Sequence, residues 1–304
     1  MASVDRSAVV WFRDDLRLAD QPALRAALDT GRPVVALYVH DEGRSSGRAL
    51  GGASRWWLHH SLAALGESLE TIGGRLDIVA GEHADMPRIV AALDAACVFW
   101  TRRYGGADVA CDAEVKARLV ADGVEAHSFN GQLLREPWEV STKAGTPMRV
   151  FTPFWRAHQA LGAIARPLPA PRKMKAAPWP KGAPKRSALA DLDLLPIRPD
   201  WAEGLRETWT PGERGAEARL ARFLDDALAA YAEDRDRPDK DATSQLSPHL
   251  RFGEISPRRV WAAVKHLEES KPAVARPAAK FLSELGWREF SYHLLFHHPD
   301  LATR

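Results

Sequence analysis

The chain has 304 residues, of which 45% are hydrophobic and 27% charged, a composition that predicts about two globular domains and excludes wholesale disorder. Its formal net charge of +2 excludes binding to nucleic acid through overall charge alone, so any DNA binding must come from a local patch. No apolar run reaches the roughly 18 to 20 residues of a membrane helix, and the start MASVDRSAVVWF lacks a secretion signal. We therefore expect a cytoplasmic protein without a membrane partner.

The cysteine and tryptophan contents narrow the function classes further. Cys97 and Cys111 form neither a CxxC pair nor part of a His/Cys cluster. This spacing argues against a disulfide framework and a structural zinc site, and we predict no metal. The 11 tryptophans exceed ordinary usage. Most of them should serve packing, although flavin-binding and base-stacking proteins also use indoles heavily.

Residues 1–130 alternate short apolar runs with amphipathic stretches, which is typical of a parallel sheet with crossover helices. We predict an α/β domain with an open, Rossmann-like parallel sheet. Its expected strands cover 8–12, 34–39, 76–79, 97–100 and 124–129. Neither a GxGxxG fingerprint nor a Walker loop follows any of these strands, so the usual dinucleotide and triphosphate motifs are excluded.

The helices of this domain have recognisable ends. Asp20 is the expected N-cap of the first helix, and Gly31 ends it. Ser54 is expected to begin a longer helix whose apolar residues recur every three or four positions and which ends at Gly73. Two further helices should cross 89–93 and 115–119.

Residues 131–200 are predicted to connect two domains. Prolines crowd between 167 and 199, and helical or strand periodicity disappears there. The same stretch holds a basic run without an acid, made of Arg172, Lys173, Lys175, Lys181, Lys185 and Arg186. A solvated linker is the simpler interpretation of this run, and a DNA-contacting patch is the alternative.

Residues 201–304 have helical character without a convincing strand. A helix over 216–232 would carry its leucines and a phenylalanine on one face. The Ser-Pro pairs at 247–248 and 256–257 each place a capping hydroxyl before a proline suited to the first helical position. The last helix should cover about 277–297. We therefore predict an all-α domain after the proline-rich connection.

Three groups of segments carry more specific information. VVWFRDDLRLADQPAL (9–24) ends a strand in alternating Arg and Asp, and the residues alone leave a salt-bridged turn of Arg13, Asp14 and Arg17 as one interpretation and a site as the other. GTPMRVFTPFWRA (145–157) is dense in aromatic residues. The third group comprises YAEDRDRPDKDATSQLSPHLRFGEIS (231–256) and FLSELGWREF (281–290).

In their order and spacing these segments resemble the DNA photolyase and cryptochrome family. SRWWLHHSLAALGESL (54–69) and GQLLREPWEV (131–140) extend the resemblance over nearly the whole chain. The resemblance implies an N-terminal α/β domain that holds an antenna chromophore and a C-terminal helical domain that holds FAD. This division agrees with the one expected from composition and periodicity.

The segment around residue 245 suits a flavin. A pyrophosphate needs hydrogen-bond donors, which the hydroxyls of Thr243, Ser244 and Ser247 and the free N–H groups of a helix start would supply. Ser247 would also cap that helix. In the family this segment contacts FAD, and the resemblance assigns that contact to Thr243, Ser244, Gln245, Leu246 and Ser247. It also implies that Tyr231 lies near the FAD phosphates and that Arg235 touches a DNA phosphate.

Four residues of the last expected helix complete the predicted site. Phe281, Glu284, Trp287 and Arg288 lie at i, i+3, i+6 and i+7, so they should share one face that lines a cavity. The resemblance implies that Glu284 hydrogen-bonds a pyrimidine carbonyl, with a raised pKa in a largely dry pocket. It implies that Trp287 stacks on a flipped dimer and that Phe281 lies near the flavin. Arg288 would neutralise flavin or DNA charge, whereas the residues alone would make Glu284 and Arg288 a surface ion pair.

The helical domain of the family continues beyond the point where this sequence stops. The H-N-R-x-R segment and the tryptophan chain are missing, so we expect a chain truncated within the FAD-binding domain. It would be either a fragment of a full photolyase or a natural short form with half a flavin site, and we expect the activity to belong to the complete protein rather than to this chain alone. The expected domains are 1–130, 131–200 and 201–304. A short segment, TRRYGG (101–106), resembles a W-N-R-R-Y type segment with Trp100 retained and Thr101 in place of Asn. It implies methenyltetrahydrofolate rather than a deazaflavin as the antenna.

For the complete protein we expect light-driven repair of cyclobutane pyrimidine dimers by electron transfer from reduced FAD. The protein would then be a monomeric deoxyribodipyrimidine photolyase whose partner is damaged DNA. The resemblance leaves open whether the lesion is a cyclobutane dimer or a 6-4 product. A signalling cryptochrome is one alternative, against which Glu284 and Trp287 argue because both fit a dimer pocket. A non-enzymatic nucleotide-binding α/β domain with a helical appendage is the other.

Overall fold

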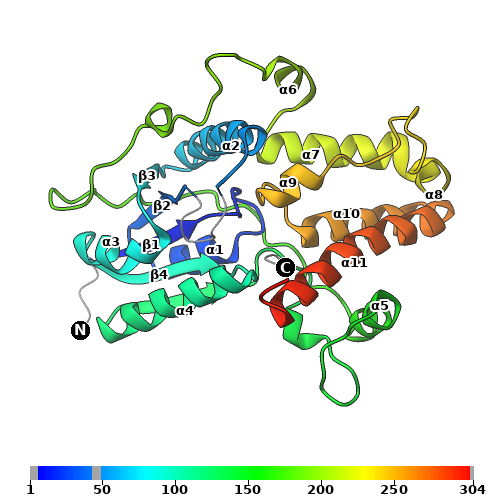
Figure 1. Ribbon diagram of the computed structural model, residues 1–304, viewed down its shortest axis with the longest axis horizontal. Coiled ribbons are helices and arrows are strands. Elements are labelled where there is room, and N and C mark those ends of the chain that lie inside the picture. Colours follow the sequence, from blue (N-terminus) through cyan, green and yellow to red (C-terminus); the bar gives the residue numbers. More distant parts are fainter. Residues whose placement is uncertain (1–5, 43–48, 302–304) are drawn as a thin grey trace.

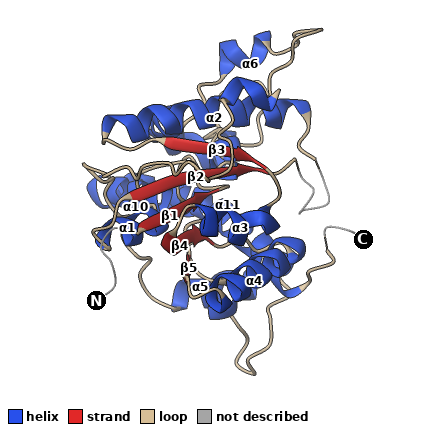
Figure 2. Ribbon diagram, turned by 90° about the vertical axis from the view of Figure 1, so that its left-hand side faces the viewer, coloured by secondary structure: helices blue, strands red, loops and turns tan. Residues whose placement is uncertain are grey.

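The N-terminal half is built on a five-stranded, fully parallel sheet. The computed structural model describes residues 6–42 and 49–301. In space the strands follow the order β3-β2-β1-β4-β5, as Figure 2 shows. Their bounds are β1 Ser7–Phe12, β2 Val34–His40, β3 Leu76–Ala80, β4 Ala95–Thr101 and β5 Glu125–Phe129. The predicted open, Rossmann-like parallel sheet is confirmed, because short apolar runs separated by amphipathic helices have only this way of burying both faces.

Helices surround the sheet and form the other half of the molecule. Those of the first half are α1 Pro22–Asp29, α2 Gly52–Thr71, α3 Met86–Ala92 and α4 Gly106–Ala121. Later in the chain follow α5 Phe151–Ala160, α6 Glu203–Thr208, α7 Glu213–Arg222, α8 Tyr231–Asp234, α9 Ser247–Arg251, α10 Pro257–Ser270 and α11 Ala275–His297. Figure 1 shows the sheet with α1 to α4 in one half and α7 to α11, together with α5, in the other. None of the helices among the described residues is long and apolar enough to cross a bilayer.

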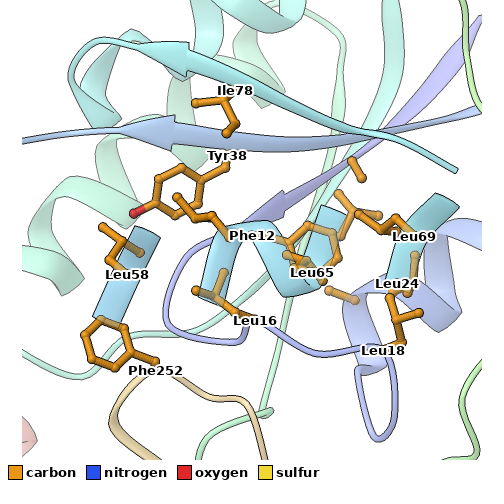
Figure 3. Close-up of a cluster of buried hydrophobic side chains, with 14 of the residues drawn as sticks. Phe12, Leu16, Leu18, Leu24, Tyr38, Leu58, Leu65, Leu69, Ile78 and Phe252 are labelled. Atoms are coloured by element: carbon orange, nitrogen blue, oxygen red, sulfur yellow. The ribbon is translucent and has the colours of Figure 1, made fainter. Parts of the chain in front are cut away.

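Two hydrophobic cores cover the two faces of the sheet. Alternate residues of β1 point in opposite directions, so Val10 and Phe12 pack with α1 and α2, while Val9 and Trp11 pack with α3 and α4. Phe252, which follows α9 in the helical half, belongs to the first core (Figure 3). The helical half therefore contributes a side chain to the core of the α/β half.

Two expected helix starts differ from the structure. Asp20 does not cap α1; the side chain of Gln21 does, by accepting a hydrogen bond from Ala23 N. Asp20 instead has a left-handed φ of 50° and uses its carboxylate in tertiary contacts. The second helix begins at Gly52, two residues before the expected Ser54. A capping rule uses only neighbouring residues, so it cannot predict that the Asp20 carboxylate binds Arg258, more than 200 positions away.

The proline-rich connection packs against the α/β half over part of its length. Met174 N donates to Ile72 O at 2.7 Å, and Ala177 N donates to Val34 O at 2.9 Å. Met174 and Ala177 are buried, and Arg186 of the basic run pairs with Asp77 at 3.0 Å. Earlier in the predicted connection, α5 packs against α11. The exact domain boundaries stay a prediction.

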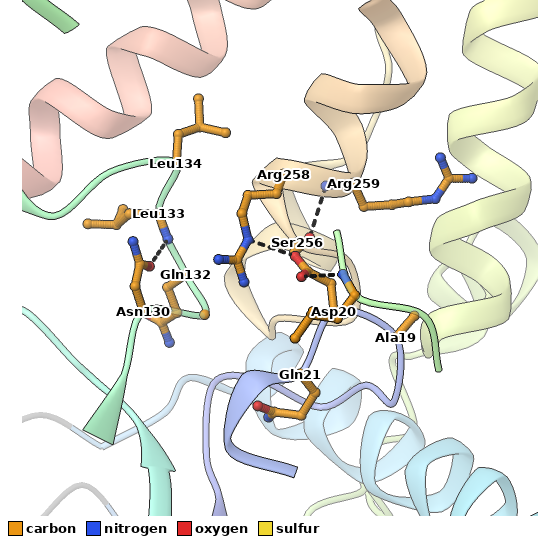
Figure 4. A network of polar contacts seen from close by, with 12 residues as sticks. Ala19, Asp20, Gln21, Asn130, Gln132, Leu133, Leu134, Ser256, Arg258 and Arg259 are labelled. Carbon is orange, nitrogen blue, oxygen red and sulfur yellow. Dashed lines mark hydrogen bonds and ion pairs between the residues drawn. The ribbon is translucent and has the colours of Figure 1, made fainter. Parts of the chain in front are cut away.

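The loop between β1 and α1, residues 13–21, joins the two halves. Arg17 is buried and donates to the carbonyl oxygens of Gly253 at 2.8 Å and Gly131 at 2.6 Å. Asp20 accepts from Arg258 Nε at 3.0 Å and from Leu168 N at 2.9 Å, as Figure 4 shows for the side chain of Arg258. These hydrogen bonds provide partners for the Arg17 guanidinium and the Asp20 carboxylate, which would otherwise be costly to bury.

A buried polar cluster lies beside this junction. The Glu254 carboxylate accepts from Trp57 Nε1 at 2.9 Å and from the Ser61 hydroxyl, both on α2. Its second oxygen lies 2.5 Å from His249 Nδ1 on α9. Ser61, His249 and Glu254 are all fully buried. The cluster thus ties α9 to a helix of the α/β half.

Gly253 permits the closest approach between the halves. Its φ is +65°, and a Cβ at this position would lie 2.0 Å from Asp14 O. Leu16 N donates to the carbonyl of the neighbouring Phe252 at 3.1 Å. Any side chain at 253 would therefore push the β1–α1 loop away from the helical half.

Gly253→Ala should lower the free energy of unfolding by about 3 kcal/mol or more, because left-handed strain and a backbone clash add together. Gly123→Ala is the matched control, since Gly123 has a φ of +74° but no atom of residues 6–42 or 49–301 lies within 4 Å of the added Cβ; it should cost only about 1 kcal/mol. Urea denaturation of both variants measures the difference. Equal losses would mean that the close approach at Gly253 is not a constraint.

Candidate functional site

One surface pocket of the helical half brings together three of the five residues predicted from 243–247. Thr243, Ser244 and Gln245 line it together with Arg219 and Arg222 of α7. The hydroxyls and guanidinium groups offer hydrogen-bond donors and positive charge, which a phosphate requires. The two arginines were not identified from the sequence, although their spacing of three puts them on one face of a helix.

Acidic residues balance the charge of this pocket, which Asp226 and Asp241 also line. Arg222 pairs with Asp241 at 2.9 Å, and Gln245 Nε2 donates to the same aspartate at 2.7 Å. Gln245 has a left-handed φ of 53°, and its buried Oε1 has no hydrogen-bond partner among the described residues. That oxygen can accept a hydrogen bond from a hydroxyl group. The pocket therefore suits a ligand that carries both a phosphate and sugar hydroxyls.

Leu246 and Ser247, which were also expected to contact FAD, are not among the residues that line this pocket. Leu246 is buried in the core of the helical half. Ser247 is the first residue of α9 and its side chain makes no cap, because Leu246 occupies the N-cap position. The expectation of a capping hydroxyl at Ser247 is wrong, whereas Ser256 caps α10 as predicted by accepting from Arg259 N.

Three aromatic rings adjoin the pocket. Phe223, which lines it, lies 4.5 Å from Phe281 and 5.5 Å from Tyr231 between ring centroids. Tyr231 and Phe281 meet edge to face at 5.3 Å. Burial raises the pKa of Tyr231, so its hydroxyl stays protonated and able to donate. Phe223 opens a π-helical turn, Phe223–Ala227, at the end of α7, and turns of this kind are frequent at functional sites.

Arg235 and Glu284 contact each other, which the sequence did not predict. Their side chains form an ion pair, and Lys280 lies 3.1 Å from the same carboxylate. The Arg235 guanidinium also lies over the Tyr231 ring at 5.5 Å. The Glu284 side chain is 28% exposed, so its surroundings are cationic and partly hydrated rather than the largely dry pocket that we expected. Arg235 thus contacts both the buried Tyr231 ring and the Glu284 carboxylate.

The other two residues of the predicted α11 face make separate contacts. Trp287 is 45% exposed and stacks on Phe151 of α5, with ring centroids 3.8 Å apart and planes at 11°. Arg288 turns toward the α/β half, where it donates to Gln132 O at 2.7 Å. The four residues therefore do not line one shared cavity. Nor do Glu284 and Arg288 pair, as the residues alone would suggest, because each has another partner.

A second cleft lies where the parallel strands end. It is lined by residues at the ends of β1 to β4 or after them, by residues at or in the starts of α2 and α4, and by two residues of the helical half. They are Arg13, Asp14, Tyr38, Asp41, Leu50, Leu58, His83, Arg103, Asp108, Arg251 and Phe252. In sheets of this kind ligands bind at the carboxyl ends of the strands, where the strand order reverses. This rule could have predicted the position of the cleft from the sequence. It could not have predicted the individual lining residues, because they come from distant parts of the chain.

The charged residues of this cleft pair across the fold. Arg13 pairs with Asp112 at 2.5 Å, and Asp14 pairs with Arg251 at 2.6 Å. Of the two interpretations of Arg13, Asp14 and Arg17, a turn closed by its own ion pairs is wrong, because each side chain bonds to distant residues. Burial, together with the nearby arginines, lowers the pKa of His83 to about 3, so this imidazole is neutral.

Comparison with known proteins identifies the family. The model of the family described as DNA photolyase matches residues 8–172. The chain belongs to the DNA photolyase family. A deoxyribodipyrimidine photo-lyase of Agrobacterium fabrum is 47% identical over 297 residues, which cover 97% of this chain and 60% of that protein. A crystal structure of a bacterial class III photolyase from Agrobacterium tumefaciens is similar with a TM-score of 0.91 and 46% identity, covering 99% of this chain and 61% of that one.

Cryptochromes also resemble this member of the photolyase family, at lower identity. Cryptochrome-1 of Arabidopsis thaliana is 34% identical over 308 residues, which cover 96% of this chain and 43% of that protein. The chain spans about 60% of the length of the photolyases named above. For this chain, the activity of those longer proteins is therefore a proposal.

Glu289 anchors α11 of this photolyase-family chain to the segment that leads from β5 into the helical half. The side chain is buried, accepts from Leu134 N at 2.8 Å, and lies 3.5 Å from Arg288. Burial outweighs these favourable contacts and raises the pKa of Glu289 to about 7. The carboxyl is thus close to half protonated at neutral pH.

This shift predicts a pH-dependent stability. Because the pKa of Glu289 is raised on folding from its ordinary 4.5 to about 7, the folded state binds more protons between these values, and stability should fall as pH rises through this window. The contribution is about 3 kcal/mol by linkage. Glu289→Gln should remove it, so the variant should lose less stability than the wild type between pH 5 and 8 in urea denaturation.

The exposed Glu114 of α4 provides the control for this experiment. Glu114→Gln should leave the pH dependence of the wild type unchanged. A Glu289→Gln profile parallel to the wild type would contradict the raised pKa.

Proposed function

We propose that the protein to which this chain belongs repairs cyclobutane pyrimidine dimers in DNA by light-driven electron transfer from reduced FAD. The observation that carries the proposal is the arrangement of Glu284 and Trp287, which lie three residues apart on α11, with Arg235 paired to Glu284. A protonated carboxyl group can donate a hydrogen bond to a base carbonyl, an exposed indole can stack on a base ring, and a guanidinium can bind a phosphate. The 47% identity to a deoxyribodipyrimidine photo-lyase over 97% of the chain supports it.

The pocket of Thr243, Ser244 and Gln245 fits part of a flavin dinucleotide. Arg219 and Arg222 would hold the pyrophosphate together with the two hydroxyls, and the unpartnered Oε1 of Gln245 would accept a sugar hydroxyl. Tyr231 and Phe281 would close the neighbouring apolar side. When bound, the reduced flavin would supply an electron after absorbing blue light and take it back once the dimer has split.

The residues of the chain would then bind and orient the lesion. Trp287 offers its exposed indole for stacking on a flipped pyrimidine. Glu284, once released from Arg235 and protonated, would donate a hydrogen bond to a pyrimidine carbonyl. Arg235 would bind a neighbouring phosphate. Because Arg235 and Glu284 hold each other in this structure, DNA binding would have to exchange that ion pair for two contacts to the nucleic acid. Arg288, which donates to Gln132 O, would take part only after a change of rotamer.

The cleft at the carboxyl ends of the strands would take the antenna chromophore. Its arginines and carboxylates suit a polar heterocycle with an anionic tail. Methenyltetrahydrofolate has that chemistry and remains our proposal for this chromophore. Monomeric DNA binding and a cytoplasmic location complete the proposed function.

A signalling cryptochrome is the second candidate, because the likeness to Cryptochrome-1 covers 96% of this chain. The two functions differ in their need for a dimer pocket. A photolyase requires a stacking wall and a carbonyl partner for the base, which Trp287 and Glu284 would supply. Selective binding of dimer-containing DNA therefore separates them, and stoichiometric flavin absorbance separates both from a non-enzymatic nucleotide-binding domain.

Trp287→Ala should reduce the preference for dimer-containing over undamaged DNA by roughly tenfold, because stacking is worth about 1 to 3 kcal/mol per base. Trp201→Ala is the control, since Trp201 is similarly exposed, at 48% against 45%, but lies outside the proposed site. Fluorescence anisotropy titrations of both DNAs measure the preference, and illumination of the FAD-loaded chain then measures dimer loss. Equal weakening for both DNAs would contradict the dimer pocket.

Arg235→Ala should weaken both DNAs alike and lower the slope of log affinity against log salt by about 1. The loss should be larger in the Glu284→Gln background, because with Glu284 present the removal of Arg235 also removes the cost of breaking their ion pair. The coupling free energy between the two positions should be on the order of 0.5 to 1 kcal/mol for a partly exposed pair. Titrations of the four proteins at two salt concentrations measure it. Strictly additive effects would mean that the ion pair is not broken by DNA.

A further inference from the structure

Trp287 is the last ring of an aromatic column between α5 and α11. The rings of Trp155 and Phe151 lie 6.3 Å apart with planes at 11°, and Phe151 and Trp287 follow at 3.8 Å, again at 11°. Phe290 meets both Phe151 and Trp287 edge to face, at 6.0 Å and 5.9 Å. Three nearly parallel rings, held from the side by a fourth, therefore lead to the exposed indole.

The column depends on a glycine of α11. A Cβ at Gly286 would lie 2.6 Å from the Trp155 ring, so only glycine lets this indole lie against the helix backbone. Phe151 and Trp155 are four residues apart on α5 and thus share one face of that helix. They meet the adjacent positions 286 and 287 of α11. This contact fixes α5 against α11 and determines where the Phe151 ring lies.

An exposed tryptophan on a helix can normally change rotamer at little cost. Trp287 is restrained, because one face of its indole is covered by Phe151 while 45% of the residue stays exposed. The uncovered face can accept one more ring in the same orientation. A stacked base would extend the column without first ordering the indole, and such preorganisation strengthens binding.

We propose that Phe151 is a positioning residue that holds the Trp287 indole in the orientation needed to stack on a pyrimidine of the lesion. The inference rests on the proposed function, in which Trp287 contacts the base. It adds that selectivity for the lesion depends on α5, a helix that carries none of the site residues predicted from the sequence. Phe151 itself is not assigned a contact with DNA.

Binding selectivity gives the first test. Phe151→Leu keeps an apolar side chain of similar volume but removes the ring, and it should lower the preference for dimer-containing over undamaged DNA about fivefold. Phe151→Tyr restores the ring and should restore the preference. Phe296→Ala is the control, because Phe296 is another aromatic residue of α11 that contacts Trp138 and Tyr104 instead of the column.

Fluorine NMR of protein labelled with 5-fluorotryptophan gives a second test that needs no DNA. The resonance of Trp287 is identified by its loss in Trp287→Phe. In Phe151→Leu it should shift and broaden, or split, as the indole samples several rotamers, whereas Phe151→Tyr and Phe296→Ala should leave it nearly unchanged.

The outcomes separate the inference from the proposed function. If Trp287→Ala abolishes lesion preference but Phe151→Leu leaves both the preference and the Trp287 resonance intact, the positioning role is wrong and the proposed function stands. If the wild-type chain shows no lesion preference, the proposed function fails, and the role of Phe151 in lesion binding fails with it. Loss of preference in Phe151→Leu, with rescue by Phe151→Tyr, supports both.

Discussion

The structure depends on the contact between the β1–α1 loop and residues 249–258. Arg17 donates to carbonyl groups of both halves, and Gly253 approaches the loop too closely for any side chain. Asp20 and Arg258 add an ion pair in which the carboxylate is almost completely buried. Each group would be costly to bury alone, so the contacts form together or not at all. The result is a junction in which backbone carbonyls and paired charges surround the apolar contact of Phe252.

This junction determines where the candidate site lies. Glu254 holds His249 of α9 against Trp57 and Ser61 of α2, and α9 follows directly on the segment that carries Thr243, Ser244 and Gln245. At the other end of the helical half, Glu289 fixes α11 to the backbone at Leu134. The candidate phosphate pocket is therefore tied through α9 to α2 of the α/β half, and the Glu284–Trp287 side of α11 is tied to the segment that follows β5. The distance between the phosphate pocket and the Glu284–Trp287 side of α11 therefore depends on these long-range contacts and not on local structure.

The strands and most helices could be predicted because their signals are local. Apolar runs such as 34–39 can only be buried strands, and the helix of 54–69 repeats its leucines at helical spacing. Asp20 was misassigned because its carboxylate bonds to Leu168 and Arg258, partners that a local rule cannot see. Likewise, helical spacing placed four residues on one face of α11, but α5 covers Trp287 and the backbone at Gln132 attracts Arg288. Long-range contacts of this kind leave no periodic pattern in the sequence.

The most direct test of the account is native-state hydrogen exchange of the chain, followed by mass spectrometry at increasing urea concentrations. If the junction makes the two halves one cooperative unit, the amides of Leu16 and Glu254 should exchange through the same opening as those of β1, with the same free energy and the same dependence on urea. The reporting bonds are Leu16 N to Phe252 O and Glu254 N to His249 O. Exchange of residues 249–258 at low urea, while β1 stays protected, would contradict the claim that this junction holds the candidate site in place.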